Sequence, residues 1–236
     1  MKISVCIATY NGSKYIVDQL NSILFQLDER DEIIISDDSS SDDTIDKIKS
    51  LRDNRIKIYS GDFKSPIYNF ENSLKHANGD FIFLSDQDDV WLEGRVSEML
   101  KQMSLGFDLV VSDCRIVDES LRELRSSYFE FNNSRGGFLK NLWRNSFMGC
   151  CMAFNRKILD NILPFPSKLP MHDSYIGLLA ELKFNVVFLP KPLLLYRQHL
   201  NNASSTSVGI SEYSFLTKMG FRIRLIYALC NKLIKI

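Results

Sequence analysis

Three aspartates follow one apolar segment of this 236-residue chain. The segment spans residues 81–84, and the carboxylates are those of Asp86, Asp88 and Asp89. Two carboxylates separated by one residue, like those of Asp86 and Asp88, can hold a divalent cation through hard oxygen ligands and leave room for phosphate oxygens. A solvated acidic loop after a strand is the alternative interpretation of so short a motif. The residues at the ends of the other expected strands distinguish these two interpretations.

Two earlier apolar segments also end in polar side chains. Residues 2–8 run into a turn that contains a glycine, and residues 32–36 run into a pair of acids. If all three segments are parallel strands, their carboxyl ends share the edge of the sheet where ligands bind in open α/β folds. The sequence therefore gathers five side chains into one crevice: Thr9, Asn11, Asp38, Asp86 and Asp88.

The elements that must position these residues follow from periodicity. Apolar residues recur at helical spacing over 16–27, 45–51 and 69–77, between strands expected at 2–8, 32–36, 55–59 and 81–84. This alternation predicts parallel strand–helix–strand units with helices on both faces of the sheet, which is an α/β fold.

The second half of the chain is less regular. We expect helices over 93–103 and from 173 onward, and strands over 107–112, 146–154 and 185–189. Residues 118–137 are polar and predict a loop or small insertion, which either lies over the site or is a plain surface connection. Asp108 and Asp113 are expected to be structural.

Composition excludes several classes of protein. The formal net charge is zero, so a general basic field for nucleic acid is absent. The five cysteines form no C-x-x-C pair and mostly lie in apolar segments, which indicates reduced, buried thiols of a cytosolic protein and no zinc site. No apolar run is long enough to span a bilayer, and the first residues indicate a strand, with no signal peptide.

Three motifs in this order resemble the inverting glycosyltransferases of family 2: CIATYNGSKYI, IIISDDSSSDDT and NGDFIFLSDQDDVW. The resemblance is strong over about the first hundred residues. The SDQDDVW form is similar to that of bacterial enzymes of O-antigen and capsule synthesis, including rhamnosyltransferases. It implies the GT-A fold, a Rossmann-like sandwich with a mostly parallel central sheet.

The resemblance also implies a donor site. Thr9, Tyr10 and Asn11 would line the nucleotide pocket, and Asp38 would accept a hydrogen bond from the imide N–H of uracil or thymine. Asp86 would contact the nucleotide, so the donor would be a UDP- or dTDP-sugar. Ser39 stands where the family pattern often has glycine.

Metal and catalytic residues are implied in the same way. Asp88, with Asp86, matches the family's metal ligands, and His199 is similar to a late histidine that reaches the metal or the diphosphate. The cofactor would be Mg²⁺ or Mn²⁺. Asp173 falls where the family keeps its general base, although an acid at a helix start is often only a dipole partner.

Three more residues are expected at the sugar and acceptor pocket: Trp91, Gly149 and His172, the last in the family's usual glutamate position.

The resemblance divides the chain into a glycosyltransferase domain at 1–212 and a C-terminal segment at 213–236. The domain would have a nucleotide-binding half at 1–105 and an acceptor half at 106–212. The segment has basic residues and an apolar helical face that includes Ile223 and Ile226. It either lies in a membrane interface or docks on its own domain.

The predicted function is therefore metal-dependent, inverting transfer of a sugar to a saccharide acceptor, expected to be lipid-linked, in bacterial surface polysaccharide synthesis. The protein would be cytoplasmic or peripheral on the inner face of the membrane. A non-catalytic nucleotide-sugar-binding module and a metal-dependent phosphatase are the alternatives. A dehydrogenase is disfavoured because no G-x-G-x-x-G follows the first strand.

Overall fold

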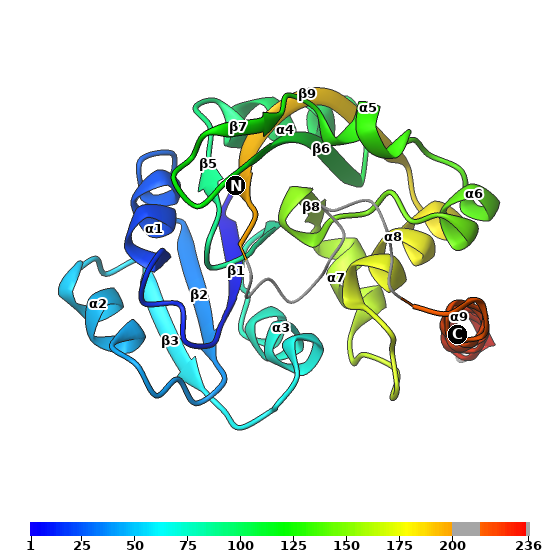
Figure 1. Ribbon diagram of the computed structural model, residues 1–236, viewed down its shortest axis with the longest axis horizontal. Helices are drawn as coiled ribbons and strands as arrows, with labels where there is room; N and C mark the ends of the chain where they lie inside the picture. The colour runs from blue at the N-terminus through cyan, green and yellow to red at the C-terminus, as the bar shows by residue number, and fades with distance from the viewer. Residues whose placement is uncertain (200–212, 235–236) are drawn as a thin grey trace.

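The computed structural model describes residues 1–199 and 213–234 (Figure 1). Its first half alternates strands with helices, as the periodicity predicts. The elements are β1 (Ile3–Thr9), α1 (Ile16–Leu24), β2 (Glu32–Asp37), α2 (Thr44–Ser50), β3 (Ile56–Ser60), α3 (Pro66–Lys75) and β4 (Phe81–Ser85). Right-handed crossovers place α1 and α2 on one face of the sheet and α3 on the other.

The second half contains shorter elements and ends in a long helix. They are β5 (Val90–Trp91), α4 (Arg95–Ser104), β6 (Leu109–Val117), β7 (Glu123–Arg125), α5 (Tyr128–Asn132), α6 (Phe138–Trp143), the 3₁₀ turn η1 (Gly149–Cys151), β8 (Met152–Asn155), α7 (Arg156–Ile162), α8 (His172–Lys183), β9 (Val186–Arg197) and α9 (Phe215–Ile234).

One sheet joins both halves in the order β3-β2-β1-β4-β8-β6-β9-β5, with β7 paired to β6. The four N-terminal strands are parallel, as are β6 and β9, whereas β8 runs antiparallel between β4 and β6. Most paired residues are therefore parallel, and the expected α/β class is confirmed. The ends of β1, β2 and β4 lie at one edge, where the site is built.

Three expectations for the second half need correction. The strand expected over 146–154 is a 3₁₀ turn followed by the short strand β8, because the N–H of Cys151 bonds to the carbonyl of Met148 at 3.0 Å. The strand expected to end at 189 continues as β9 to Arg197, and register shifts against β6 accommodate its prolines. Residues 118–137 contain β7 and α5 and are not a plain loop.

The Asp113 carboxylate explains why that segment folds. It accepts hydrogen bonds from the Ser127 hydroxyl at 2.5 Å and from the N–H of Phe129 at 2.9 Å. Ser127 in turn caps α5 by accepting from the N–H of Glu130. Asp113 is therefore structural, as expected. Periodicity could not predict its contact with a helix that begins about fourteen residues later.

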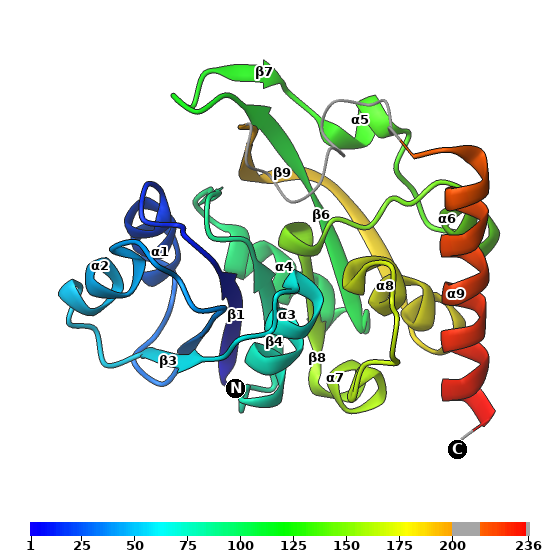
Figure 2. The same cartoon turned by 60° about the horizontal axis from the view of Figure 1, so that its bottom comes forward.

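The cysteines are free, and four of them are buried (Cys6, Cys114, Cys150 and Cys151), while Cys230 on α9 is exposed. The helix α9 stands at one end of the molecule beside α6 and α8 (Figure 2). The boundary expected at residue 212 lies outside the described residues.

Candidate active site

A cavity of about 660 Å³ opens at the carboxyl ends of β1, β2 and β4. Five of the predicted site residues line it: Thr9, Tyr10, Asp38, Asp86 and Asp88. The opposite wall comes from the loop after β3 and the start of α3, with Ser65, Asn69 and Phe70. Three strand ends that are far apart in sequence thus bring three carboxylates to one pocket.

Thr9 is buried, and its hydroxyl donates to the Asp37 carboxylate at 3.0 Å. Its carbonyl accepts from the side-chain amide of Asn69 at 3.0 Å and from the N–H of Asp38 at 2.9 Å. These bonds tie the end of β1 to β2 and α3, so they fix the floor of the pocket. Periodicity did not single out Asp37 or Asn69, because each acts through hydrogen bonds to another segment.

The Asp38 carboxylate accepts three backbone N–H bonds, from Phe63, Lys64 and Ser65. They hold the loop after β3 against the pocket. A carboxylate has about four acceptor positions, so one remains for a ligand N–H. Ser39 adopts φ 58°, which shows that the turn keeps the left-handed conformation for which glycine is favoured.

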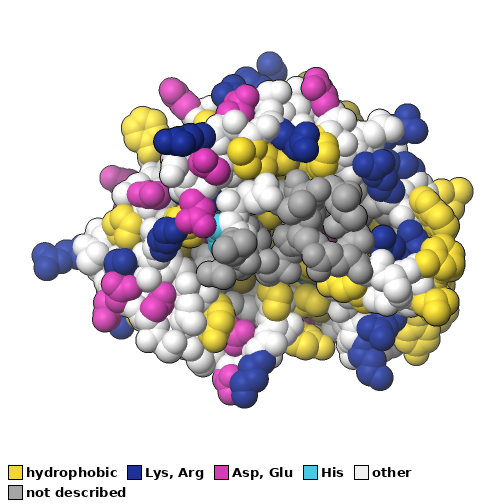
Figure 3. All heavy atoms as spheres, in the orientation of Figure 1, with side chains coloured by type: hydrophobic (Ala, Val, Ile, Leu, Met, Phe, Trp, Pro, Cys, Tyr) yellow, Lys and Arg dark blue, Asp and Glu magenta, His cyan; other side chains and the backbone are white. Residues whose placement is uncertain are grey.

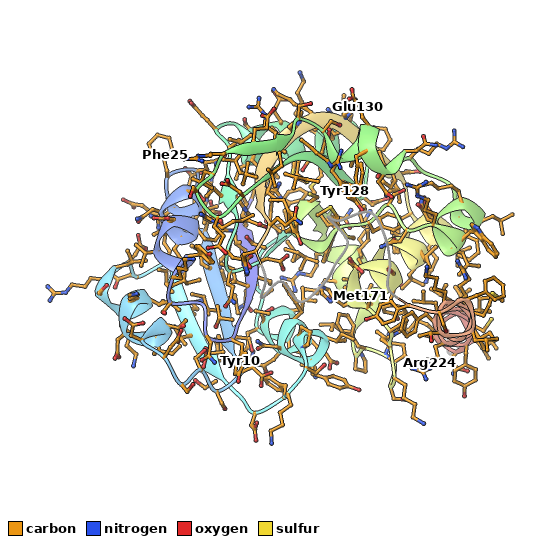
Figure 4. All side chains as sticks on the ribbon, in the orientation of Figure 1. Tyr10, Phe25, Tyr128, Glu130, Met171 and Arg224 are labelled. Carbon is orange, nitrogen blue, oxygen red and sulfur yellow. The ribbon has the colours of Figure 1, made fainter. Side chains whose placement is uncertain are left out.

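The side chain of Gln87 clamps the turn after β1. Its Oε1 accepts from the N–H of Tyr10 at 2.9 Å, and its Nε2 donates to the Tyr10 carbonyl at 3.1 Å. Asn11 links the same turn to the one after β2, since its Oδ1 accepts from the N–H of Ser41 at 2.8 Å. Tyr10 points outward at the pocket rim (Figure 4) and is largely exposed. Gln87 was missed because the pattern drew attention to the acids on either side of it.

Mutual repulsion characterises the acids at the end of β4. Burial, together with the negative charges of Asp88 and Asp173, raises the pKa of Asp86 to about 7. Burial also raises the pKa of Asp89 well above its usual value, as do Asp88 and Asp86. A site that crowds carboxylates in this way favours a cation, because positive charge relieves both the repulsion and the cost of burial.

Asp88 and His199 meet although they are far apart in sequence. The imidazole Nε2 of His199 lies 2.8 Å from Oδ2 of Asp88. The ring stacks on Tyr15 with centroids 5.1 Å apart, and the Arg197 guanidinium also lies over the Tyr15 ring, 4.5 Å from its centroid. Nε of Arg197 donates to the Asp88 carbonyl at 2.8 Å. Tyr15 was not expected here, since nothing in its sequence context distinguishes it from a core aromatic residue.

The residues present fit a divalent cation. Carboxylates with an imidazole suit Mg²⁺ or Mn²⁺. Oδ2 of Asp89 is buried without a hydrogen-bond partner, and Asp86, Asp89 and Cys150 each offer a ligand atom, all within 4.8 Å of one another. Asp86 thus shares one cluster with Asp89 and Cys150, while Asp88, whose charge also acts on Asp86, is paired with His199.

Asp173 opens α8 beside these acids. Its Oδ1 accepts from the N–H of Ser174 and from the Ser174 hydroxyl. Burial raises the pKa of Asp173 to about 6. At neutral pH it is therefore ionised and a stronger base than an ordinary aspartate, which suits proton abstraction.

His172 is buried, and neither ring nitrogen has a hydrogen-bond partner. Burial lowers its pKa to about 4, so the imidazole is neutral. The ring stacks on Phe70 of the pocket wall, with centroids 4.4 Å apart. A Cβ at Gly149 would lie 3.2 Å from Nε2 of His172 and 3.7 Å from Cβ of Asp173, so the three predicted residues are neighbours.

Trp91 has a different environment from the one expected. Its indole is 3% exposed, donates to the Ser85 hydroxyl at 3.2 Å and lies 4.7 Å below the Arg95 guanidinium. These contacts support the floor of the site from behind, and Trp91 is absent from the cavity wall. A role for it in the sugar pocket stays a prediction.

The model of glycosyl transferase family 2 matches residues 4–163, more than half of the chain. The chain belongs to this family. The family match and the strand-end acids together establish a glycosyltransferase rather than a phosphatase. Among the described residues, no helix is long and apolar enough to cross a membrane.

Curated relatives of this family 2 member include three bacterial enzymes. GalNAc(5)-diNAcBac-PP-undecaprenol beta-1,3-glucosyltransferase of Campylobacter jejuni is 28% identical over 93% of this chain and 72% of its own length. UDP-Glc:alpha-D-GlcNAc-diphosphoundecaprenol beta-1,3-glucosyltransferase WfgD of Escherichia coli is 28% identical over 89% and 81%. The dTDP-rhamnosyl transferase RfbG of Shigella flexneri is 25% identical over 86% and 74%.

Solved structures share the fold of this glycosyltransferase. S. aureus TarS 1–349 in complex with UDP-GlcNAc superposes with a TM-score of 0.72 and 20% identity, over 96% of this chain and 66% of that one. The mannosyltransferase PcManGT from Pyrobaculum calidifontis, in complex with GDP-Man and Mn²⁺, gives a TM-score of 0.63 at 14% identity, over 98% and 73%. The chain thus spans about two thirds of the length of the TarS fragment.

Proposed function

We propose that this glycosyltransferase moves a sugar from a UDP- or dTDP-sugar to a saccharide acceptor carried on a lipid diphosphate, with inversion at the anomeric carbon. The observation that carries the proposal is the cavity of about 660 Å³ that Asp38, Asp86 and Asp88 line together. Relatives that act on diphosphoundecaprenol substrates, and a relative named for dTDP-rhamnose, support the acceptor and donor classes.

The donor would lie along this cavity. Asp38, with its remaining acceptor position, would bind the imide N–H of uracil or thymine, and Thr9, Tyr10 and Asn11 would shape the nucleotide pocket. Asp86, Asp88 and His199 would hold Mg²⁺ or Mn²⁺. The cation, when bound, would neutralise the charge that the nucleoside diphosphate acquires as it leaves.

Asp173 would act as the general base. As the acceptor oxygen forms its bond to the anomeric carbon, the bond from that carbon to the diphosphate oxygen breaks, and the acceptor proton passes to Asp173. Gly149 and His172 would border the sugar and acceptor, and Trp91 would support this pocket from behind its floor. The raised pKa of Asp173 supports this role, because a base works best with a pKa nearer the working pH.

A lipid-linked acceptor requires the enzyme to reach a membrane. We therefore place the protein at the cytoplasmic face of the membrane, in peripheral contact through residues 213–236. The division into a domain at 1–212 and this C-terminal segment belongs to the same proposal.

A thermal-shift panel tests the donor class. UDP-, dTDP- and GDP-sugars are each added with and without Mn²⁺ or Mg²⁺, because a ligand that binds the native state raises stability by RT ln(1 + [L]/Kd). We expect metal-dependent stabilisation by the UDP or dTDP compounds. Stabilisation by the GDP compound alone would refute the role of Asp38, and release of inorganic phosphate without transfer would refute the reaction.

A further inference from the structure

The helix α9 docks on the protein with a face that sequence periodicity does not suggest. Leu225, Ala228 and Leu229 are buried and join the main core, next to α8. Arg222 and Lys232 also turn toward the protein: Arg222 donates to the carbonyls of Leu142 and Trp143, and Lys232 donates to that of Leu163 at 2.7 Å. Basic side chains thus anchor the helix to its own domain.

The apolar face of α9 consequently points outward. Ile223, Ile226, Tyr227 and Ile234 are exposed, with Ile234 at 80%. Figure 3 shows apolar side chains gathered along the edge of the molecule where α9 lies. Single exposed apolar residues are ordinary, but a continuous row of them on one helix marks an interaction surface.

A second element extends this surface. Leu139 and Trp143 lie one helical turn apart on α6, and both are largely exposed, at 78% and 62%. The Arg222 guanidinium lies 4.2 Å from the centroid of the Trp143 ring, so α6 and α9 are joined at this point. Both views of the ribbon show α6 beside α9 (Figures 1 and 2). We call the surface formed by Leu139, Trp143, Ile223, Ile226, Tyr227 and Ile234 the α6–α9 face.

We propose that the α6–α9 face is the surface on which this protein lies in the interface of an anionic membrane. Neither helix contains an acidic residue, and Arg144 and Arg224 are exposed beside the apolar side chains, so the charge around the face complements anionic lipid headgroups. Trp143 and Tyr227 are of the type that prefers the membrane–water boundary. A helix with this distribution lies in the plane of the interface.

The inference extends the proposed contact of residues 213–236 to α6, which lies some 70 positions earlier in the sequence. It also fixes the orientation, because the helix meets the lipid with Ile223 and Tyr227 and meets its own domain with Leu225 and Leu229. Membrane binding by this face does not depend on the transfer reaction, so the two can fail separately.

Vesicle flotation of the full chain tests the proposal. We expect flotation with phosphatidylcholine vesicles that contain phosphatidylglycerol, weaker flotation without the anionic lipid, and a loss at high salt. The double variant Ile223→Glu/Tyr227→Glu should reduce partitioning at least about tenfold, since it brings charge into the apolar contact. Trp143→Glu should reduce it as well, which a contact made by α9 alone would not produce.

Phe25→Glu is the matched control. Phe25 is 82% exposed and lies after α1, on the opposite side of the molecule from α9 (Figure 4). Its substitution should leave flotation unchanged. Stabilisation by UDP should be the same in all variants, which separates a failure of this surface from a failure of the donor site.

Trp143 also provides a direct readout. The chain has two tryptophans, and Trp91 is buried, so vesicle-induced changes in fluorescence report on Trp143. We expect a blue shift and quenching by brominated lipid. Absence of flotation by the wild type, or an equal loss in Phe25→Glu, would overturn the proposal. A change from dimer to monomer in the face variants, without any effect on vesicles, would assign the face to a second copy of the chain.

Discussion

Replacing Asp173 by asparagine should make the protein more stable and much less active. Asparagine keeps the size of the side chain and an oxygen that can accept from Ser174, but it cannot take a proton. General-base removal lowers rates by about 10²- to 10⁴-fold. Donor affinity should change little, because no cavity-lining atom is removed.

The expected gain in stability follows from the raised pKa. A shift from 3.8 to about 6 corresponds to about 3 kcal/mol of disfavoured ionisation in the folded state. Asp173 is only partly buried, so solvent screening reduces this to about 1–2 kcal/mol. For a domain of this size that is a rise in Tm of about 2–8 °C in the variant.

The sign of the pH dependence is specific. A carboxyl with a raised folded pKa binds its proton more tightly when folded, so wild-type stability falls as pH rises from about 4 to about 6 and the full penalty remains above that. The variant should therefore exceed the wild type in Tm at pH 8 and match it near pH 4. The turnover rate of the wild type should fall as the pH drops below about 6, because Asp173 is then protonated and cannot act as a base.

Calorimetry at both pH values and a transfer assay test these points together. Asp160→Asn is the control, because Asp160 is exposed on the neighbouring helix α7. A variant that transfers sugar at nearly the wild-type rate would show that Asp173 is only an acid at a helix start. A lower Tm at pH 8 would show that its carboxylate stabilises α8.

Three further substitutions probe the rest of the site. Asp88→Asn should weaken both Mn²⁺-dependent donor binding and turnover, measured by calorimetric titration and transfer assay; unchanged Mn²⁺ dependence would exclude Asp88 as a ligand. His172→Phe removes two unpartnered nitrogens whose burial costs about 1–3 kcal/mol each. It should therefore raise Tm at pH 7 and reduce the wild-type loss of stability between pH 6.5 and 4; a lower Tm would reveal a hidden partner of the imidazole. Gln87→Ala should weaken nucleotide binding several-fold in the thermal-shift assay by freeing the turn at Tyr10, and an unchanged shift would mean that the turn is rigid without the clamp.

The first half of the fold could be predicted because each of its strands and helices carries its own signal. The run of isoleucines in β2 is typical of a buried strand, and the spacing of the buried positions 16, 20 and 23 is typical of a helix, so both elements can be predicted from local sequence. In the second half, order depends on distant partners. The contacts of Asp113 with α5 and the bulged register of β9 against β6 are tertiary, and no local pattern encodes them.

The site shows the same division. The strand-end residues Thr9, Asp38, Asp86 and Asp88 could be found because parallel strands bring their carboxyl ends together. Tyr15, which orients His199, could not, because its role exists only once β9 has returned beside α1. For α9, periodicity identified the apolar face but not whether that face packs on the protein or is exposed to solvent. This depends on the surface of α8 against which the helix docks.

The clamp between Gln87 and the turn after β1 has a consequence for how this sequence can vary. A Cβ at position 12 would lie 2.3 Å from Oε1 of Gln87, so the clamp exists only while residue 12 is glycine. Neither position can change alone without loss: a larger residue at 12 expels the amide, and a shorter side chain at 87 leaves the N–H and carbonyl of Tyr10 without their partner. The two positions should therefore covary among related sequences, with glycine at 12 retained where 87 is glutamine and released where it is not.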